Sequence, residues 1–323
     1  MERKADLKAR IVFMGTPDFA VATLNALNKA GNYIVGVVTA PDRPAGRGQK
    51  PRPSAVKEYA VEHGLNVLQP EKLRNEEFLK ELKALNADLF IVVAFRMLPE
   101  MVWALPPKGT INLHASLLPQ YRGAAPINWA IINGEKQTGV TTFFIQKEID
   151  TGDLIHQEKV EINKDMNAGQ LHDQLMNVGA GLIVKTVEDV MSGEHPSTPQ
   201  SEIAEGGLRS APKIQKETCR INWNDSVDNV VNLIRGMSPY PAAFTEFEKD
   251  GQIFRMKIFQ ANKVEGSGAN TEAGTLIQEK DKLLATCSNG VISLEEVQLS
   301  GKKRMLSEEL LRGFNVEHVL KMH

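Results

Sequence analysis

The stretch that decides the fold reads Thr110-Ile111-Asn112-Leu113-His114-Ala115-Ser116-Leu117-Leu118-Pro119-Gln120-Tyr121-Arg122. It follows a Pro-Pro-Lys-Gly turn signal, and its first residues alternate as they do in a strand. Side chains two positions apart on a strand share a face, so Asn112 and His114 point one way while Ile111 and Leu113 point the other. An amide beside an imidazole at a strand end can donate hydrogen bonds to a polarised carbonyl group. From the pattern alone, a core strand carrying a satisfied buried histidine is an equally good interpretation.

Strands and helices alternate on both sides of this stretch. Strand-like runs are expected at residues 11–14, 33–38, 67–68, 89–93, 109–114 and 140–145, with an edge strand at 155–160. Helical patterns are expected at residues 18–30, 54–63 (with Ser54 as the N-cap), 76–85, 127–133 and 168–191. Continuous apolar runs that alternate with helices are typical of a parallel sheet buried on both faces. The sequence therefore predicts an α/β fold, a Rossmann-like doubly wound parallel sheet.

The turn after the first predicted strand carries a single glycine, Gly15. Dinucleotide-binding turns need the G-x-G-x-x-G pattern to bring the backbone close to a pyrophosphate, so an NAD-dependent enzyme is a weak alternative. Ligands of open parallel sheets still bind beyond the carboxyl ends of the strands. Asn112 and His114 are expected to lie at that edge.

The second half of the chain has a different pattern. Residues 192–212 are rich in Gly, Pro, Ser and Glu and lack sustained periodicity, which is typical of a linker. Beyond them we expect a helix at 226–235, strands around 243–247, 253–264, 274–278, 283–286 and 291–298, and a closing helical turn at 307–312. Asp250-Gly251 and Asn289-Gly290 are hairpin signals. Short strands with little helix predict a small β-barrel.

Composition limits the class of protein. A length of 323 residues suggests two domains, and the net charge of −2 excludes a generally basic nucleic-acid binder, so any RNA contact must come from local patches. Cys219 and Cys287 lack C-x-x-C spacing and no H-E-x-x-H occurs, which predicts a reducing compartment and no metal. The most apolar segment, residues 89–95, is far shorter than a membrane span, and the charged first ten residues do not resemble a signal peptide. We therefore expect a soluble cytoplasmic protein.

Several motifs resemble those of one enzyme family. Asn112-x-His114, followed by Ser116-Leu117-Leu118-Pro119 and by Tyr121-Arg122-Gly123-Ala124-Ala125-Pro126, resembles the signature of the folate-dependent formyltransferases. Ile149-Asp150-Thr151-Gly152-Asp153 stands where that family has its catalytic aspartate. Residues 13–19 and 39–48 are similar to the members of the family that act on methionyl-tRNA, and the match runs in order over nearly the whole chain. One departure is Phe95-Arg96-Met97, where relatives often carry a small residue and a glutamine.

The resemblance implies a reaction and a domain organisation. The formyl donor would be 10-formyltetrahydrofolate, and the acceptor would be the α-amino group of methionine on initiator tRNA. It implies a formyltransferase catalytic domain at residues 1–192, a linker at 193–212 and an OB-like tRNA-binding domain at 213–323. We also expect a monomer that needs no metal, membrane or obligate protein partner. The alternatives are a formyltransferase acting on a ribonucleotide amine or an amino sugar, and a non-catalytic tRNA-binding protein.

The same resemblance assigns roles at the candidate catalytic site. His114 and Asn112 would donate hydrogen bonds to the formyl oxygen as negative charge develops on it. Asp150 would orient the imidazole and receive a proton through water, although Asp-Thr-Gly-Asp alone is also typical of a turn. Asp153 is given the turn role. Four residues are expected to contact the tetrahydrofolate: Ser116, Leu117, Leu118 and Pro119.

A cationic loop is the candidate RNA contact of the first domain. Residues 41–53 carry Arg43, Arg47, Lys50 and Arg52 against one acid, Asp42, and we expect their prolines and glycines to keep them out of regular structure. The loop resembles the family's insertion that enters the acceptor end of the tRNA, with Arg43 as the main reader. In the second domain, the cations expected to contact phosphates are Lys213, Lys216, Lys302, Lys303 and Arg304.

Overall fold

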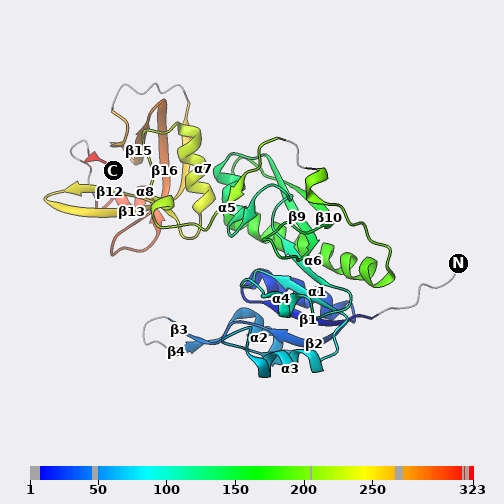
Figure 1. Ribbon diagram of the computed structural model, residues 1–323. Helices are drawn as coiled ribbons and strands as arrows, with labels where there is room; N and C mark the ends of the chain where they lie inside the picture. Colours follow the sequence, from blue (N-terminus) through cyan, green and yellow to red (C-terminus); the bar gives the residue numbers. More distant parts are fainter. Residues whose placement is uncertain (1–7, 46–49, 204–205, 266–271, 315, 317–319) are drawn as a thin grey trace. The chain divides into compact units, whose positions relative to one another are not determined.

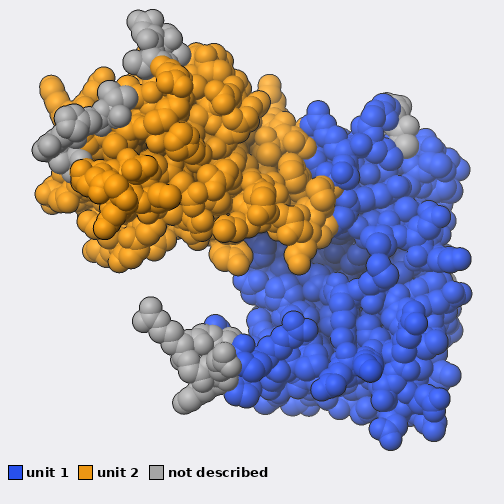
Figure 2. Space-filling model, turned by 60° about the vertical axis from the view of Figure 1, so that its left-hand side comes forward, with its two compact units in different colours: residues 1–123, 138–160, 172–210 blue, residues 124–137, 161–171, 211–323 orange. Residues whose placement is uncertain are grey.

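The structure, a computed structural model, describes residues 8–45, 50–203, 206–265, 272–314, 316 and 320–323. The chain divides into two compact units, coloured blue and orange in Figure 2. Unit 1 comprises residues 1–123, 138–160 and 172–210; unit 2 comprises residues 124–137, 161–171 and 211–323. The chain therefore passes between the units more than once along its sequence.

Unit 1 is built on a sheet with the strand order β10-β9-β7-β6-β1-β2-β5 (Figure 1). Its strands are β1 (Arg10–Gly15), β2 (Tyr33–Val38), β5 (Val67–Leu68), β6 (Leu89–Val93), β7 (Thr110–His114), β9 (Gln137–Phe144) and β10 (Leu154–Glu161). The neighbouring strands in the run β7-β6-β1-β2-β5 all pair in parallel, which confirms the predicted Rossmann-like arrangement. Strand β9 runs antiparallel to β7, so the sheet is mostly rather than wholly parallel. Strand β10 lies at the sheet edge, as predicted.

Local capping sets the helix boundaries. The helices are α1 (Asp18–Lys29), α2 (Ala55–Glu62), α3 (Glu76–Ala84), α4 (Glu100–Trp103) and α6 (Ala168–Ser192). The Ser54 hydroxyl accepts a hydrogen bond from the Lys57 amide at 3.1 Å, which confirms it as the N-cap of α2. The side chain of Asn75 caps α3 in the same way, accepting from the Phe78 amide at 3.0 Å.

The sheet is covered on both faces, which explains why its strands are apolar throughout. On one face Val12, Met14, Phe90 and Val92 form a core cluster, together with Phe78 and Leu82 of α3 and Val102 of α4. The alternate residues Ile11, Phe13 and Ile91 are fully buried as well. The ends of the strands, and not their faces, are thus left for a ligand site.

Strand β7 presents two different faces, as its alternation predicts. Leu113 faces α6 so closely that a Cβ on Gly179 would lie 2.8 Å from it. Asn112 pairs in register with Val92 of β6 and so lies on the face opposite to Leu113. His114 follows Asn112 on that same face.

The cationic loop contains regular structure, and the expectation that it would not was wrong. Strands β3 (Arg43–Ala45) and β4 (Lys50–Arg52) pair as an antiparallel ribbon. Pro44 lies directly opposite Pro51. Antiparallel ladders alternate between hydrogen-bonded and non-hydrogen-bonded pairs, and two facing prolines fit the second kind because neither has an N–H to donate.

Segment 193–212, expected to be a linker, does more than connect. It contains the short helix η1 (Gln200–Glu202) and strand β11 (Ser210–Ala211). The side chain of Gln200 is only 3% exposed. This segment therefore contributes to the packing of unit 1.

Unit 2 holds a nearly closed antiparallel barrel, which confirms the predicted small barrel. Its strands are β12 (Ala243–Lys249), β13 (Gln252–Val264), β14 (Thr275–Glu279), β15 (Lys282–Cys287), β16 (Gly290–Leu299) and β18 (Leu320–Lys321), in the order β12-β13-β16-β15-β14-β18, with β17 (Met305–Leu306) paired to β16. A bridge between Phe247 and Met322 joins the two ends of this order. The remaining elements include α5 (Pro126–Ile132), η2 (Glu217–Cys219), α7 (Val227–Met237) and α8 (Ser307–Leu311).

Both predicted hairpins form, although one turn is displaced. Asp250 and Gly251 join β12 to β13 with φ angles of +54° and +75°, as the Asp-Gly signal requires. Between β15 and β16, Cys287 pairs with Gly290, so the turn consists of Ser288 and Asn289, one residue earlier than expected. Gly290 belongs to the strand.

The two cysteines are buried free thiols. Burial raises the pKa of Cys287 to about 12, so this thiol stays protonated at neutral pH. Among the described residues, no group of three or more His, Cys, Asp or Glu side chains is arranged to hold a metal ion. None of the helices in the described part of the chain is long and apolar enough to cross a bilayer.

Candidate active site

His114 ends strand β7 at the carboxyl edge of the parallel strands, with only 7% of its surface exposed. Its Nε2 lies 2.9 Å from the carbonyl oxygen of Tyr121. A carbonyl oxygen can only accept, so this contact places a proton on Nε2. Nδ1 is therefore the ring atom left for a substrate, as an acceptor in the neutral ring and as a donor in the charged ring.

Asp150 is brought to that free nitrogen from a distant part of the sequence. Its Oδ2 lies 4.0 Å from Nδ1 of His114, beyond direct hydrogen-bond reach. The same Oδ2 accepts a hydrogen bond from the Gly123 amide at 3.0 Å, and this bond fixes the carboxylate. Asp150 has a φ of +55°, in the left-handed region that short polar residues such as Asp tolerate. Asp150 is thus both a residue of the turn and the candidate catalytic group.

Asn112 lies two positions before His114 on the same face of β7 and is half-buried. Within the described residues its side-chain amide makes no hydrogen bond, so its donors are available to a ligand. The structure therefore brings the three predicted catalytic residues to one strand end and the loop beside it. Their catalytic roles stay predictions.

The residues expected to contact tetrahydrofolate are mostly buried in the loop after β7. The hydroxyl of Ser116 donates to the carbonyl of Gln120 at 2.6 Å. Leu118 packs in a cluster with Phe143 and Leu154, and Pro119 is buried beside it. Leu117 is half-buried. These side chains brace the loop, and their contact with the folate stays a prediction.

Sequence reasoning missed Gln200. Its side chain reaches the carbonyl oxygens of Asp150 and Gly152 and the guanidinium of Arg122. No periodic or motif signal marks it, because it lies in the segment that lacks both.

Arg96 reaches the loop after β5. Its Nη1 donates to the carbonyl of Glu71 at 2.9 Å, and its Nη2 donates to the carbonyl of Pro70. Burial, followed by the charge of Arg43, lowers the pKa of this guanidinium below its ordinary value. The unusual Arg96 is thus a support for the β5–α3 loop.

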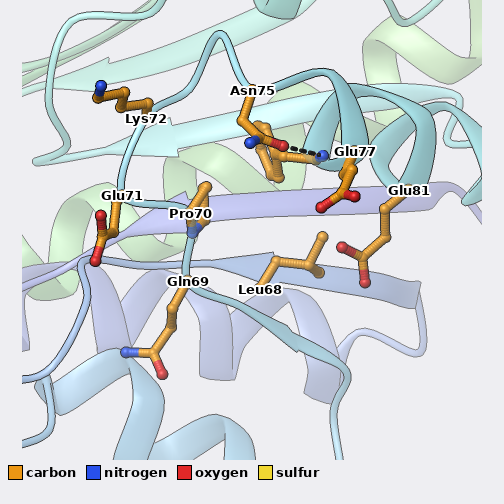
Figure 3. Close-up of a pocket in the computed structure, with 9 residues that line it drawn as sticks. Leu68, Gln69, Pro70, Glu71, Lys72, Asn75, Glu77 and Glu81 are labelled. Carbon is orange, nitrogen blue, oxygen red and sulfur yellow. Dashed lines mark hydrogen bonds between the residues drawn. The ribbon is translucent and has the colours of Figure 1, made fainter.

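A pocket of about 530 Å³ lies at this β5–α3 loop (Figure 3). Its lining includes the acidic side chains Glu71, Glu77 and Glu81 and one cation, Lys72. None of the predicted catalytic residues lines it. It is separate from the candidate active site.

The predicted RNA-contacting cations fall into local groups. Arg43 and Arg52 are exposed and face each other across the β3–β4 ribbon. Arg47 lies outside the described residues, as does the side chain of Lys50. Of the predicted contacts in unit 2, Lys213, Lys216, Lys302 and Lys303 are exposed. Arg304 differs, because its Nε donates to Glu296 at 2.6 Å and its guanidinium lies 4.2 Å from the Phe259 ring centroid.

Three further polar residues have structural partners. His156 Nε2 lies 2.8 Å from Asp189, a partner that the sequence did not indicate. Asp153 accepts a hydrogen bond from the Ser197 hydroxyl at 2.9 Å. His172 packs edge-on against the Phe19 ring.

Comparison with known proteins identifies the family of this chain. Residues 9–187 match the family described as formyl transferase, and residues 213–315 match its C-terminal domain. The chain belongs to the formyl transferase family. This membership confirms the resemblance drawn from the motifs.

Within the family, the chain is 51% identical over 322 residues to a methionyl-tRNA formyltransferase of Bacteroides fragilis, covering 99% of each chain. The fold is shared with HypX from Aquifex aeolicus in complex with tetrahydrofolic acid, at 18% identity and a TM-score of 0.63 over 97% of this chain and 48% of that one. It is also shared with an N-formyltransferase from Helicobacter canadensis in complex with folinic acid and dTDP-3-aminofucose, at 19% identity and a TM-score of 0.63 over 88% and 98% of the two chains. At these identities the two solved structures support the fold alone.

Proposed function

We propose that this chain transfers the formyl group of 10-formyltetrahydrofolate to the α-amino group of methionine on initiator tRNA, giving N-formylmethionyl-tRNA for translation initiation. The observation that carries the proposal is the juxtaposition of Nδ1 of His114 with the fixed carboxylate of Asp150, beside the unengaged amide of Asn112. The choice of a tRNA acceptor rests on the full-length similarity to a relative of that name. The amino-sugar alternative rests on a shared fold at under a fifth identity and is not favoured.

The donor supplies a formyl group whose carbon leaves the folate nitrogen for the amine nitrogen, while one proton passes from the amine to the folate nitrogen. The protein's residues have two tasks in this exchange: to accept the amine proton and to stabilise negative charge on the formyl oxygen. Nδ1 of neutral His114 and Oδ2 of Asp150 lie 4.0 Å apart, so an N–H of the substrate amine can point between these two acceptors. In its charged form, His114 donates from Nδ1, and the nearby carboxylate stabilises that charge. Asn112 donates an amide hydrogen to the formyl oxygen.

The folate is assigned to the loops at the carboxyl edge of the sheet, where ligands of open parallel sheets bind. Met97, in the loop after β6, exposes 72% of its surface and so offers an apolar contact at this edge. Asn112 on the neighbouring strand offers hydrogen-bond donors. We propose that the folate is held by Asn112, by the loop after β6 and by residues 116–119 of the loop after β7.

The proposal assigns tRNA contacts to both units. Arg43, Arg47, Lys50 and Arg52 are assigned to the acceptor end. The lysines of unit 2 are assigned to backbone phosphates. The division into a catalytic domain (1–192), a linker (193–212) and a tRNA-binding domain (213–323) is part of the proposal, as is a monomer acting in the cytoplasm. Support for a monomer comes from the catalytic candidates, which all lie within unit 1 of one chain.

The test is incubation of the protein with 10-formyltetrahydrofolate and methionine-charged initiator tRNA, followed by chromatography of the released amino acid. Formylmethionine is the expected product, and a charged elongator tRNA is the control. A nucleotide-linked amino sugar and a ribonucleotide amine are tested in parallel. Formylation of either of these in place of the tRNA would overturn the proposal.

A further inference from the structure

Gln200 lies on the short helix η1 and is almost fully buried, with 3% of its surface exposed. Its Nε2 donates to the carbonyl oxygen of Asp150 at 3.0 Å and to that of Gly152 at 2.8 Å. Its Oε1 accepts from Arg122, at 3.1 Å from Nε and 2.6 Å from Nη2. Every strong hydrogen-bonding position of the buried amide is therefore used.

These partners leave only one orientation for the amide. Two carbonyl oxygens require donors, so the NH₂ group must face Asp150 and Gly152. The guanidinium of Arg122 has only donors, so the amide oxygen must face it. A glutamine is the side chain that supplies both kinds of group at this place.

The contacts of Gln200 meet at the candidate catalytic carboxylate. Asp150 is held at its backbone by Gln200 and at its Oδ2 by the amide of Gly123. Gly123 follows Arg122, and Arg122 is held by Gln200 as well. One buried amide thus fixes both the turn that carries the carboxylate and the segment that donates to it.

The turn needs such support. Asp150 occupies the left-handed region of backbone space, which a non-glycine residue keeps only where surrounding contacts hold it. The turn is also tightly enclosed, because a Cβ on Gly152 would lie 1.6 Å from the carbonyl oxygen of Phe144. A small shift of the turn would change the distance between Asp150 and His114.

We propose that Gln200 is a positioning residue for formyl transfer, which holds the Asp150 carboxylate at its distance from His114. This inference rests on the proposed function. The inference adds to the proposed function a residue that lies outside the segment of the chain carrying the catalytic candidates.

The test compares Gln200→Met with the wild-type protein in the formylation assay. Methionine has a similar length and is apolar, so it keeps the volume and removes every hydrogen bond. We expect kcat to fall by about 10- to 100-fold, the scale of a misplaced catalytic group, with KM unchanged for both the folate and the tRNA. Gln200→Glu is the second variant, because it keeps an acceptor for Arg122 while it sets a carboxylate oxygen against the two carbonyl oxygens. A similar loss of kcat is expected.

A double-mutant cycle separates positioning from general loss of stability. If Gln200 acts through Asp150, then Gln200→Met adds no further loss in an Asp150→Asn background. Gln137→Met is the matched control, because Gln137 is exposed and its amide donates to Glu161 at 2.7 Å. Wild-type kcat in both Gln200 variants, or losses that multiply in the cycle, would overturn the inference. Wild-type turnover by Asp150→Asn would instead remove Asp150 from the mechanism, whereas a wild-type protein that does not formylate the charged tRNA would identify the proposed function as the part that failed.

Discussion

At His114, the partner of one ring nitrogen decides what the other can do. Nε2 is committed to the carbonyl of Tyr121, so only Nδ1 can serve the reaction. His114→Ala removes that atom from a strand end whose neighbours stay packed. We expect kcat to fall by about 10²- to 10³-fold, the cost of removing a donor to a developing oxyanion.

This prediction is measured by single-turnover formylation, together with the circular dichroism spectrum as a check of folding. His63→Ala is the control, because His63 is exposed and stacks on Tyr59 away from strand β7. Normal turnover by a folded His114→Ala variant would contradict the assignment.

The sequence predicted part of this site. Alternation along residues 110–114 placed Asn112 and His114 on one face, and the motif around Asp150 supplied the carboxylate. It did not predict Gln200, because a hydrogen bond between residues 50 positions apart leaves no trace in local periodicity. Nor did it predict that Leu118 is buried against Phe143 and Leu154, because hydropathy alone does not say which apolar residues find partners.

The β3–β4 ribbon depends on contacts at its base. Asp42, next to Arg43, accepts hydrogen bonds from Lys57 at 2.6 Å and from Gln69 at 2.8 Å. The hydrogen bond from Gln69, followed by the one from Lys57, lowers the pKa of Asp42 below its ordinary value. Gln69 also donates to the carbonyl of Ala40 at 2.8 Å, so its side chain joins the β5–α3 loop to the start of the ribbon.

Removing this anchor is expected to affect one substrate more than the other. Gln69→Ala should lower kcat/KM for the charged tRNA by about two- to tenfold, equivalent to the ~0.5–1.5 kcal/mol of a net hydrogen bond. The affinity for tetrahydrofolate should stay unchanged, because the folate is assigned to other loops. Steady-state kinetics with varied tRNA, and calorimetry with tetrahydrofolate, measure the two effects. An equal loss for both substrates, or a loss in a Gln137→Ala control, would contradict this role.

In the barrel, Glu246 links β12 to two arginines. It accepts from Arg220 at 2.5 Å and from Arg255 at 2.6 Å and 2.9 Å. The hydrogen bond from Arg220, followed by that from Arg255, lowers the pKa of Glu246. A carboxylate with a lowered pKa stabilises the folded state above its unfolded pKa of about 4.3, and this contribution is lost as the pH falls through the folded value.

Glu246→Gln should therefore lower the free energy of unfolding at neutral pH by about 1 kcal/mol or less, the scale of a partly exposed ion pair. The difference from wild type should disappear in acid, below the lowered pKa. Urea unfolding across a pH series measures it, with the exposed Glu248→Gln on the same strand as control. A difference that persists at the acid end would show that the substitution acts through packing and not through charge.

Prediction from the sequence worked best for elements with strong local signals. The Ser54 cap and the Asp250-Gly251 turn formed as expected because each depends on the residue's own hydrogen-bonding or backbone preference. The β3–β4 ribbon was missed because Pro44 and Pro51 read as loop residues when each is considered alone. Their pairing opposite each other is a property of two strands together.

At the scale of the whole molecule, a formal charge of −2 must coexist with binding to a polyanion. The attraction to tRNA then depends on where the cations lie and not on the net charge of the protein. The paired arginines of the ribbon lie in unit 1, whereas Lys213, Lys216, Lys302 and Lys303 lie in unit 2. Arg304 is already paired with Glu296, so we expect it to add less than Lys302 and Lys303 beside it.

The salt dependence of tRNA binding distinguishes the two groups of cations. Each phosphate contact that is removed should flatten the log–log slope of affinity against salt by about 0.7–0.9. Replacing Lys302 and Lys303 together by alanine should therefore reduce the slope by up to about two such contacts, while kcat at saturating tRNA stays unchanged. Arg43→Ala should change the slope by at most about one contact and should lower kcat/KM more strongly, because its task is to place the acceptor end beside the reacting groups.

The measurement is tRNA affinity at several salt concentrations for the wild-type protein, the double lysine variant, Arg43→Ala and the control Lys80→Ala, whose lysine is exposed on α3. A slope in the double lysine variant equal to that of wild type would show that the turn between β16 and β17 does not contact phosphate. A loss of kcat/KM in Arg43→Ala that vanishes at low salt would reduce Arg43 to a phosphate contact. In that event Arg52, which pairs with Arg43 across the ribbon, would be the next candidate for reading the acceptor end, to be tested in the same way.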